Sequence, residues 1–79
     1  MDQLLLYSRP DCHLCDVAEG LLHAAGLGDT YQKIDIESDL KLLRRYGIRV
    51  PVLFHNNFQT ELFWPFDQAG LSDFMESGE

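Results

Sequence analysis

Residues 7–16 read Tyr-Ser-Arg-Pro-Asp-Cys-His-Leu-Cys-Asp and contain the two cysteines of the chain, Cys12 and Cys15. A short apolar run, Leu4–Tyr7, precedes the cysteines, and a segment with helical periodicity follows them. Two thiols at this spacing can close a disulfide across one turn of the chain. If Cys12 lies where a strand turns into a helix, the unpaired N–H groups and the positive dipole end of that helix stabilise its thiolate. The stretch therefore predicts a redox site at a strand-to-helix junction.

Length and charge limit the classes of function. The chain has 79 residues, of which 46% are hydrophobic and 24% charged, and this composition predicts one globular domain over residues 1–79. Its net charge of -7 argues against nucleic acid or an anionic membrane as partner, because phosphate binding relies on clustered Lys and Arg. The basic residues Lys41, Arg44 and Arg45 are interpreted as a solvated helix face rather than an anion site.

The N-terminal sequence indicates a cytoplasmic location. Residues 1–3 read Met-Asp-Gln and lack the positive charge of a signal peptide, and the apolar run after them is too short for one. Nothing in the sequence approaches the roughly 20 apolar residues that cross a bilayer. Cytosolic thiols are kept reduced, so a close cysteine pair there is more often catalytic or metal-binding than structural.

The apolar periodicity predicts an α/β fold with the element order β-α-β-α-β-β-α, a four-stranded mixed sheet flanked by helices. Strands are expected at residues 4–7, 31–36, 52–55 and 58–63, and helices at 13–25, 40–46 and 68–75. Ser38 or Asp39 is expected to cap the second helix and Asp67 the third. The first helix is expected to bury the stripe Leu14, Val17, Ala18, Leu21, Leu22 and Ala25, and the second to turn Leu40, Leu43 and Tyr46 inward. Alternation of strands and helices favours parallel pairing of the first three strands, with the fourth antiparallel.

Four features, in order along essentially the whole chain, resemble the glutaredoxin-like proteins of the thioredoxin-fold superfamily. They are the strand before Cys12-His-Leu-Cys15, the helix after it, the segment Tyr46-Gly-Ile-Arg-Val-Pro51, and the hairpin with its terminal helix. The lead-in Tyr-Ser-Arg-Pro-Asp-Cys is also similar to the Tyr-x-Lys-Pro-x-Cys of glutaredoxins. The resemblance implies a thioredoxin fold.

The resemblance also implies an activity, a thiol–disulfide oxidoreductase acting on protein or low-molecular-weight disulfides. Cys12 matches the nucleophile and Cys15 the buried resolving thiol. Pro51 matches a proline that is cis in this fold, and the backbone of Val50 would pair with a bound peptide or glutathione. Arg9 matches a basic residue that helps to hold the glutathione carboxylate. No bound cofactor is expected; glutathione is a candidate co-substrate, and glutathione or thioredoxin reductase is the expected electron donor.

Two departures from the glutaredoxin pattern qualify this expectation. Residues 61–67 read Glu-Leu-Phe-Trp-Pro-Phe-Asp and lack the Gly-Gly with which glutaredoxins hold the other end of glutathione, so weak use of glutathione is predicted. His13 and Leu14 replace the common Pro-Tyr between the cysteines, so the redox potential of better-known relatives does not carry over. The aromatic residues Phe63, Trp64 and Phe66 are expected to pack in the core and at the sheet edge rather than to form a substrate platform.

The charges around Cys12 set the balance between thiol and thiolate. The helix N-terminus, Arg9 and His13 favour the thiolate, whereas Asp11 and Asp16 oppose it. We expect a Cys12 pKa in the upper part of the range of about 3.5–7.5 that is typical of such sites, below the roughly 8.5 of a free thiol. Histidine titrates near neutrality, so His13 is expected to modulate the thiolate fraction.

The alternative hypothesis is a non-catalytic thioredoxin-fold binding module whose cysteine pair is vestigial or holds a metal. A zinc site would need Cys12, Cys15 and two of the histidines at positions 13, 23 and 55. These histidines lack a paired His-x-x-x-His spacing, so no metal is predicted. A disulfide-containing protein or a glutathione mixed disulfide is the expected partner, and a monomer is the simplest expectation.

Overall fold

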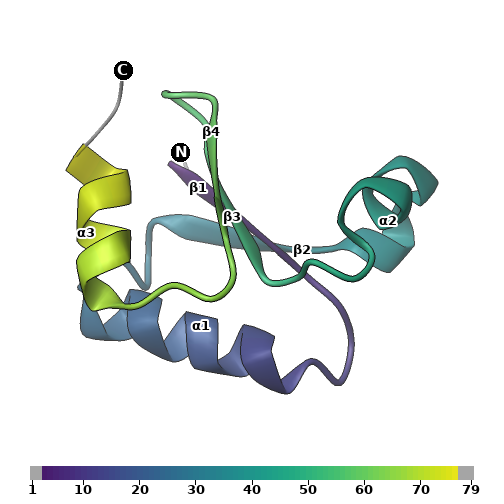
Figure 1. The fold of residues 1–79 in the computed structure, drawn as a ribbon, viewed down its shortest axis with the longest axis horizontal. Helices are drawn as coiled ribbons and strands as arrows, with labels where there is room; N and C mark the ends of the chain where they lie inside the picture. Colours follow the sequence, from purple (N-terminus) through teal and green to yellow (C-terminus); the bar gives the residue numbers. More distant parts are fainter. Residues whose placement is uncertain (1–2, 77–79) are drawn as a thin grey trace.

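The computed structural model describes residues 3–76 and shows a four-stranded mixed sheet with helices packed around it (Figure 1). Its elements are β1 (Leu4–Ser8), α1 (His13–Ala24), β2 (Tyr31–Asp35), η1 (Ile36–Ser38), α2 (Leu40–Tyr46), β3 (Val52–His55), β4 (Thr60–Phe63) and α3 (Gln68–Glu76). The predicted order of strands and α-helices is confirmed, and the 3₁₀ turn η1 is an addition to it. None of the helices within residues 3–76 is long and apolar enough to cross a membrane.

The strand order in the sheet is β2-β1-β3-β4, and the direction of β3 differs from the prediction. Strand β2 runs parallel to β1, but β3 is antiparallel to both β1 and β4. The predicted parallel pairing of the third strand is therefore wrong. Helix α2 lies beyond the end of the sheet instead of crossing its face (Figure 1), so the chain enters β3 at the same end at which it leaves β2.

The main core lies on the face of the sheet that α1 and α3 cover. It comprises eight buried residues from β1, β3, the two helices and the segment before α3: Leu4, Leu6, Ala18, Leu22, Leu53, Phe66, Leu71 and Phe74. Each large apolar side chain that is fully buried contributes about 1.5–3 kcal/mol to folding. This core holds α1 against the sheet through Ala18 and Leu22, and the two cysteines lie at the N-terminal end of the same helix.

Only part of the predicted apolar stripe of α1 faces this core. The helix is buried at Cys15, Ala18 and Leu22, whereas Leu14 and Val17 are 44% and 41% exposed. Leu14 directly precedes the buried Cys15, and Val17 directly precedes the buried Ala18. Consecutive residues lie about 100° apart around a helix axis, so both side chains point away from the core. The expectation that both are buried is wrong, and their exposure leaves apolar surface beside the cysteines.

A smaller core, on the other face of the sheet, joins the C-terminal end of α2 to the ends of β1 and β3. The ring of Tyr46 is buried and stacks on that of Tyr7, with 4.7 Å between the ring centroids. The Tyr46 hydroxyl donates a hydrogen bond to the carboxylate of Glu61 on β4 and accepts one from Arg45 Nε at 3.1 Å. Burial and the Glu61 bond raise the pKa of Tyr46 to about 12. One tyrosine therefore links α2 to two strands.

Aspartate side chains cap α2 and α3, but one residue of α2 packs differently from the prediction. Asp39 and Asp67 accept backbone hydrogen bonds from Lys41 and Gly70, each at 2.8 Å, as expected for N-caps. Leu40, however, is 60% exposed, so the expectation that it packs inward is wrong. It is the first residue of a seven-residue helix, and the apolar residues that pack in the smaller core, Leu42, Leu43 and Tyr46, follow it.

The turn between β3 and β4 is two residues longer than the sequence predicts. Strand β4 begins at Thr60, because the N–H groups of the turn before it bind a side chain instead of the opposite strand. His55 Nδ1 accepts from the N–H groups of Asn57 and Phe58 at 3.2 and 3.3 Å, and the ring of Phe58 stacks on the imidazole at 4.0 Å. His55 is 2% exposed, and burial lowers its pKa.

Candidate active site

The two cysteines lie where β1 passes into α1, the junction that the sequence predicts. Strand β1 ends at Ser8, and Asp11, at φ 57°, turns the chain toward the helix. Asp tolerates this left-handed conformation better than most residues. Cys12 is the N-cap of α1, and its Sγ accepts the N–H of Cys15 at 3.1 Å. The helix end therefore directs a backbone N–H at the Cys12 sulfur.

Cys12 and Cys15 form a disulfide, but their sulfurs differ in access. The two Cα atoms are 5.2 Å apart, within the usual range for a disulfide. Cys15 is 1% exposed and packs inside the first turn of α1, whereas Cys12 is half-buried and lines a surface hollow. Cys12 is therefore the sulfur that a dissolved disulfide or thiol can reach.

Cys12 lies in a hollow of about 400 Å³ that we call the polar hollow. Its lining comprises Ser8, Arg9, Pro10, Asp11, Cys12, Asp16, Lys33 and Asp35. Three carboxylates and two cations share this lining, and both cations are already paired with other carboxylates, Arg9 with Glu37 and Lys33 with Glu19. The local charge next to the sulfur is therefore dominated by carboxylates, which oppose thiolate formation.

Arg9 is engaged within the protein. Its Nη2 and Nε donate to Glu37 Oε2 at 2.9 and 3.0 Å, and its Nη1 donates to the carbonyl of Gly47 at 3.0 Å. A glutathione carboxylate would have to compete with Glu37 for this guanidinium. Both side chains are about 40% exposed, and pairs of this kind are typically worth only about 0–1 kcal/mol. The pair therefore weakens an anion site at Arg9 without closing it.

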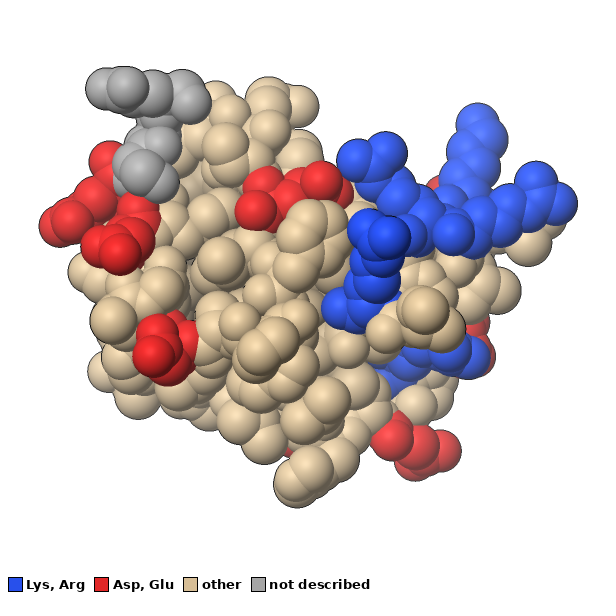
Figure 2. All heavy atoms as spheres, viewed as in Figure 1, with Lys and Arg blue, Asp and Glu red and all other residues tan. Residues whose placement is uncertain are grey.

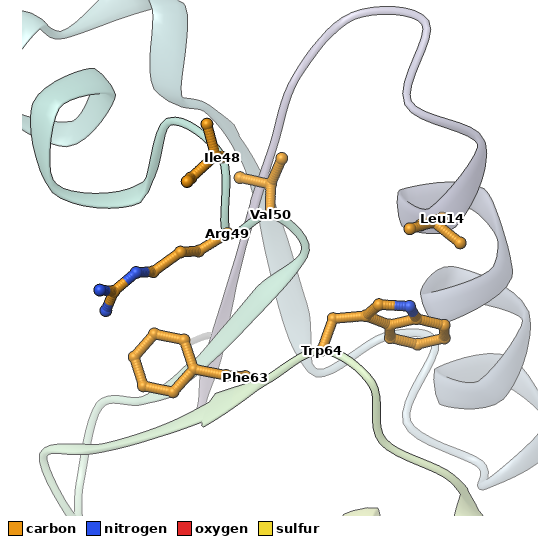
Figure 3. Close-up of a pocket in the computed structure, with 6 residues that line it drawn as sticks. All are labelled: Leu14, Ile48, Arg49, Val50, Phe63 and Trp64. Carbon is orange, nitrogen blue, oxygen red and sulfur yellow. The ribbon is translucent and has the colours of Figure 1, made fainter.

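A second hollow, which we call the apolar groove, has a very different lining (Figure 3). It measures about 410 Å³ and is lined by Leu14, Ile48, Arg49, Val50, Phe63 and Trp64. Leu14 and Trp64 lie on one side of the groove and Ile48 and Val50 on the other (Figure 3). The only charged side chain in the lining is Arg49, whose guanidinium lies over the ring of Phe63 at 5.8 Å.

The aromatic residues after β4 have two roles. Phe66 is buried in the main core, and the ring of Trp64 packs edge-on against it at 5.0 Å, as core packing predicts. Trp64 also lines the apolar groove, and Phe63 is 40% exposed at its edge. The expectation of core and sheet-edge packing therefore describes Phe66 well and Phe63 and Trp64 only in part.

The other predicted site residues are divided between these regions. Val50 lines the apolar groove, and Pro51 is buried immediately before β3. The Val50–Pro51 peptide bond is cis, and so is Trp64–Pro65, for which the sequence holds no signal. His13 is the exposed first residue of α1.

Ile48 and Arg49, in the loop between α2 and β3, line the groove although the sequence did not predict them as site residues. The sequence signal for this site is that Ile48 lies outside every predicted helix and strand, so no core position is predicted for it and it is free to lie on a binding surface.

The alternative zinc site has no support in the described part of the chain. No group of three or more His, Cys, Asp or Glu side chains within residues 3–76 is arranged to hold a metal ion. His55, one of the candidate ligands, instead uses its Nδ1 to accept two backbone N–H groups of the hairpin turn.

Comparisons with known proteins agree with this geometry. Residues 3–76 match the family described as "Glutaredoxin-like domain (DUF836)". The X-ray structure of protein XcR50 from X. campestris is 42% identical with a TM-score of 0.85, covering 94% of this chain and 96% of that one. The solution structure of protein Ne2328 from Nitrosomonas europaea is 31% identical with a TM-score of 0.78, covering 91% and 88%. No curated protein matches. The chain therefore belongs to the glutaredoxin-like family and has a thioredoxin-like fold.

Proposed function

We propose that this protein is a thiol–disulfide oxidoreductase in which Cys12 is the nucleophile and Cys15 the resolving thiol. The observation that carries the proposal is the position of Cys12 as the N-cap of α1, with its sulfur accepting the Cys15 N–H at 3.1 Å. A thiolate at this position accepts the same hydrogen bond and gains from the positive end of the helix dipole. The half-buried Cys12 meets the substrate, and the buried Cys15 is protected from it.

The reaction has two exchange steps. In the reduced protein, the Cys12 thiolate attacks a substrate disulfide, forming a mixed disulfide and releasing one substrate sulfur as a thiolate that takes a proton from water. The Cys15 thiol then loses its proton to water and attacks the Cys12 sulfur, which releases the second substrate sulfur. The substrate gains two electrons, and the protein is left with the Cys12–Cys15 disulfide.

Substrates and electron donors are assigned by chemical class. The substrate is a protein disulfide or a mixed disulfide with glutathione, and the backbone of Val50 and Pro51 belong to the side of the site that meets it. Two electrons return from glutathione or from thioredoxin reductase. The Arg9–Glu37 pair favours the protein disulfide over glutathione, because a glutathione carboxylate must displace Glu37. A cytoplasmic location suits the cycle, since the reducing cytosol regenerates the dithiol.

The test measures disulfide reduction by the wild type and by two single variants. With insulin as substrate and dithiothreitol as reductant, Cys12→Ser should lose at least about 100-fold in rate, because the nucleophile is gone. Cys15→Ser, reduced and then freed of dithiothreitol before insulin is added, should accumulate a Cys12-linked mixed disulfide with the substrate, visible by intact-mass spectrometry. Equal activity of wild type and Cys12→Ser, with no mixed disulfide on Cys15→Ser, would show that the pair does not carry out exchange.

A further inference from the structure

The positive charges of this acidic protein are concentrated at one place. Four of its six Lys and Arg residues fall within residues 41–49, although the net charge is -7. Figure 2 shows Lys and Arg side chains gathered over α2 and its surroundings, with some Asp and Glu atoms beside them and the other Asp and Glu side chains elsewhere in the view. Of these four, only Arg45 has a carboxylate partner within residues 3–76, namely Glu61. Lys41, Arg44 and Arg49 are therefore positive charges without an ion pair in the described structure.

One of these charges lies at the edge of the apolar groove. Arg49 lines the groove together with five apolar or aromatic residues, and its guanidinium rests on the Phe63 ring at 5.8 Å. Its neighbour Ile48 is 98% exposed, and Leu14, across the groove, is 44% exposed. Solvated apolar side chains gathered in this way around a hollow indicate a surface that binds something.

From this juxtaposition we infer that Arg49 is a specificity residue, and that the groove takes an extended segment of a partner protein with an apolar side chain flanked by carboxylates. The inference rests on the proposed function, whose protein substrate it describes. The apolar side chain enters between Leu14 and Ile48, and the carboxylate pairs with Arg49. Lys41 and Arg44 add long-range attraction, which orients an acidic partner that the rest of the surface repels.

The lining of the groove disfavours other occupants. In a two-fold dimer through this face, the Arg49 side chains and the basic residues of α2 would face those of the other copy, which is unfavourable for like charges. Glutathione offers carboxylates but no apolar side chain to cover Ile48 and Leu14. A basic partner would be repelled by the positive charges that residues 41–49 bring to this side of the molecule.

The experiment measures peptide binding to the oxidised protein, which separates recognition from redox chemistry. The probe is the capped peptide Gly-Glu-Leu-Ser-Leu-Glu-Gly, in which serine replaces the substrate cysteine and the symmetric sequence removes the question of direction. Two matched peptides carry Gln or Lys in place of both Glu residues. Each is titrated into ¹⁵N-labelled protein, and the dissociation constant is taken from amide shift changes at residues 48–50 and 63–64. Sedimentation velocity over the same protein concentrations reports self-association.

Three variants give the inference its sharpest test. The Glu peptide should bind more tightly than the Gln peptide, and the Lys peptide most weakly. Arg49→Gln should weaken binding of the Glu peptide by about 3- to 5-fold and remove its advantage over the Gln peptide. Lys41→Gln removes the same unit of charge outside the groove and should keep that advantage. Ile48→Ser should weaken all three peptides alike without lowering stability, because Ile48 is 98% exposed.

Several results would overturn the inference. Equal binding of the Glu and Lys peptides would do so. Equal losses of affinity for the Glu peptide in Arg49→Gln and Lys41→Gln would also do so, because Arg49 would then contribute only to the overall charge of the protein. Shift changes confined to the polar hollow, or a dimer that buries the groove, would also refute it. These outcomes are independent of the redox test: activity lost in Cys12→Ser without any peptide preference refutes this inference alone. Peptide preference without a Cys12-dependent activity refutes only the proposed reaction.

Discussion

The polar hollow and the apolar groove are almost equal in size, about 400 and 410 Å³, and opposite in character. The hollow contains the accessible sulfur, three carboxylates and two cations that are paired within the protein. The groove contains no cysteine and a single charge, which has no carboxylate partner among residues 3–76. The polar hollow is suited to setting the reactivity of Cys12, and the apolar groove is suited to substrate selection.

This division has a physical basis. A thiolate responds to the charges that surround it, so replacing the carboxylates that line the hollow should change the pKa of Cys12 and the rate for every substrate. Apolar surface acts only on a partner that covers it, so substitutions in the groove should change affinity for particular substrates. Substitutions at Glu37 and Asp16 test the effects that are assigned to the polar hollow.

The largest expected effect is on the smaller core, which contains Tyr46 and against which Val50 of the apolar groove packs. Tyr46→Ala removes the ring stacked on Tyr7 and the hydroxyl bound to Glu61, and should lower the free energy of unfolding by about 3 kcal/mol. Urea denaturation measures this loss. Leu40→Ala on the same helix is the control and should cost less than about 0.5 kcal/mol, because Leu40 is 60% exposed. If the two variants are equally stable, Tyr46 does not anchor α2.

A smaller effect on stability should appear with pH, far from either region. Burial lowers the pKa of His55, so the unfolded chain binds more protons than the folded one below the ordinary histidine pKa of about 6.5. Protonation of Nδ1 also ends its acceptance of two turn N–H groups. Stability should therefore be constant above about pH 6.5 and fall as the pH drops below it.

Urea midpoints measured between pH 5 and pH 8 test this effect. His55→Gln should flatten the profile over this range, and His23→Gln, at an exposed position of α1, should not. A wild-type profile that is already flat would contradict the assignment of a neutral His55 in the folded state.

Glu37→Gln should shift substrate preference through the polar hollow. The substitution frees the Arg9 guanidinium from its carboxylate, so the rate with a glutathione mixed disulfide should rise by about 2- to 3-fold while insulin reduction is unchanged. Glu76→Gln, at the end of α3, makes the same change in charge and serves as the control. A gain of equal size in both variants would assign the effect to net charge rather than to Arg9.

The smallest expected effect concerns the thiol itself. Asp16 lines the same hollow as Cys12, and removal of its negative charge in Asp16→Asn stabilises the thiolate. The pKa of Cys12 should fall by about 0.3, which doubles the thiolate fraction when the pH is below that pKa. The pH dependence of iodoacetamide alkylation measures it, with Asp73→Asn on α3 as control. An unchanged profile would mean that solvent screens Asp16 from the sulfur.

Much of the fold could be predicted because its signals are local. The strand Val52–His55 and the caps at Asp39 and Asp67 follow from short patterns of residue type, and the structure confirms them. The direction of β3 could not be predicted in this way. It depends on whether α2 crosses the face of the sheet or lies beyond its end, which the length of the connection leaves open.

The candidate site was predictable to a similar extent. The spacing of Cys12 and Cys15 after a strand indicated where the sulfurs lie, and the Val50–Pro51 segment completed the family pattern. The engagement of Arg9 could not be foreseen, because its partner Glu37 is 28 positions away in the sequence. The exposure of Leu14 could not be foreseen either. Periodicity shows that α1 has an apolar stripe, but it does not show how much of that stripe the sheet covers.

The sequence by itself determined the order of elements, the disulfide-forming pair at a helix N-terminus and the family of this protein. Those features depend on residue type and short spacing, which act through local backbone preferences and hydrogen bonds. Only the tertiary structure decided which charges are neutralised, which apolar residues stay exposed and how they divide into a polar hollow and an apolar groove. Those properties arise from contacts between distant residues such as Arg9 with Glu37 and Arg49 with Phe63, and such contacts depend on the path of the whole chain.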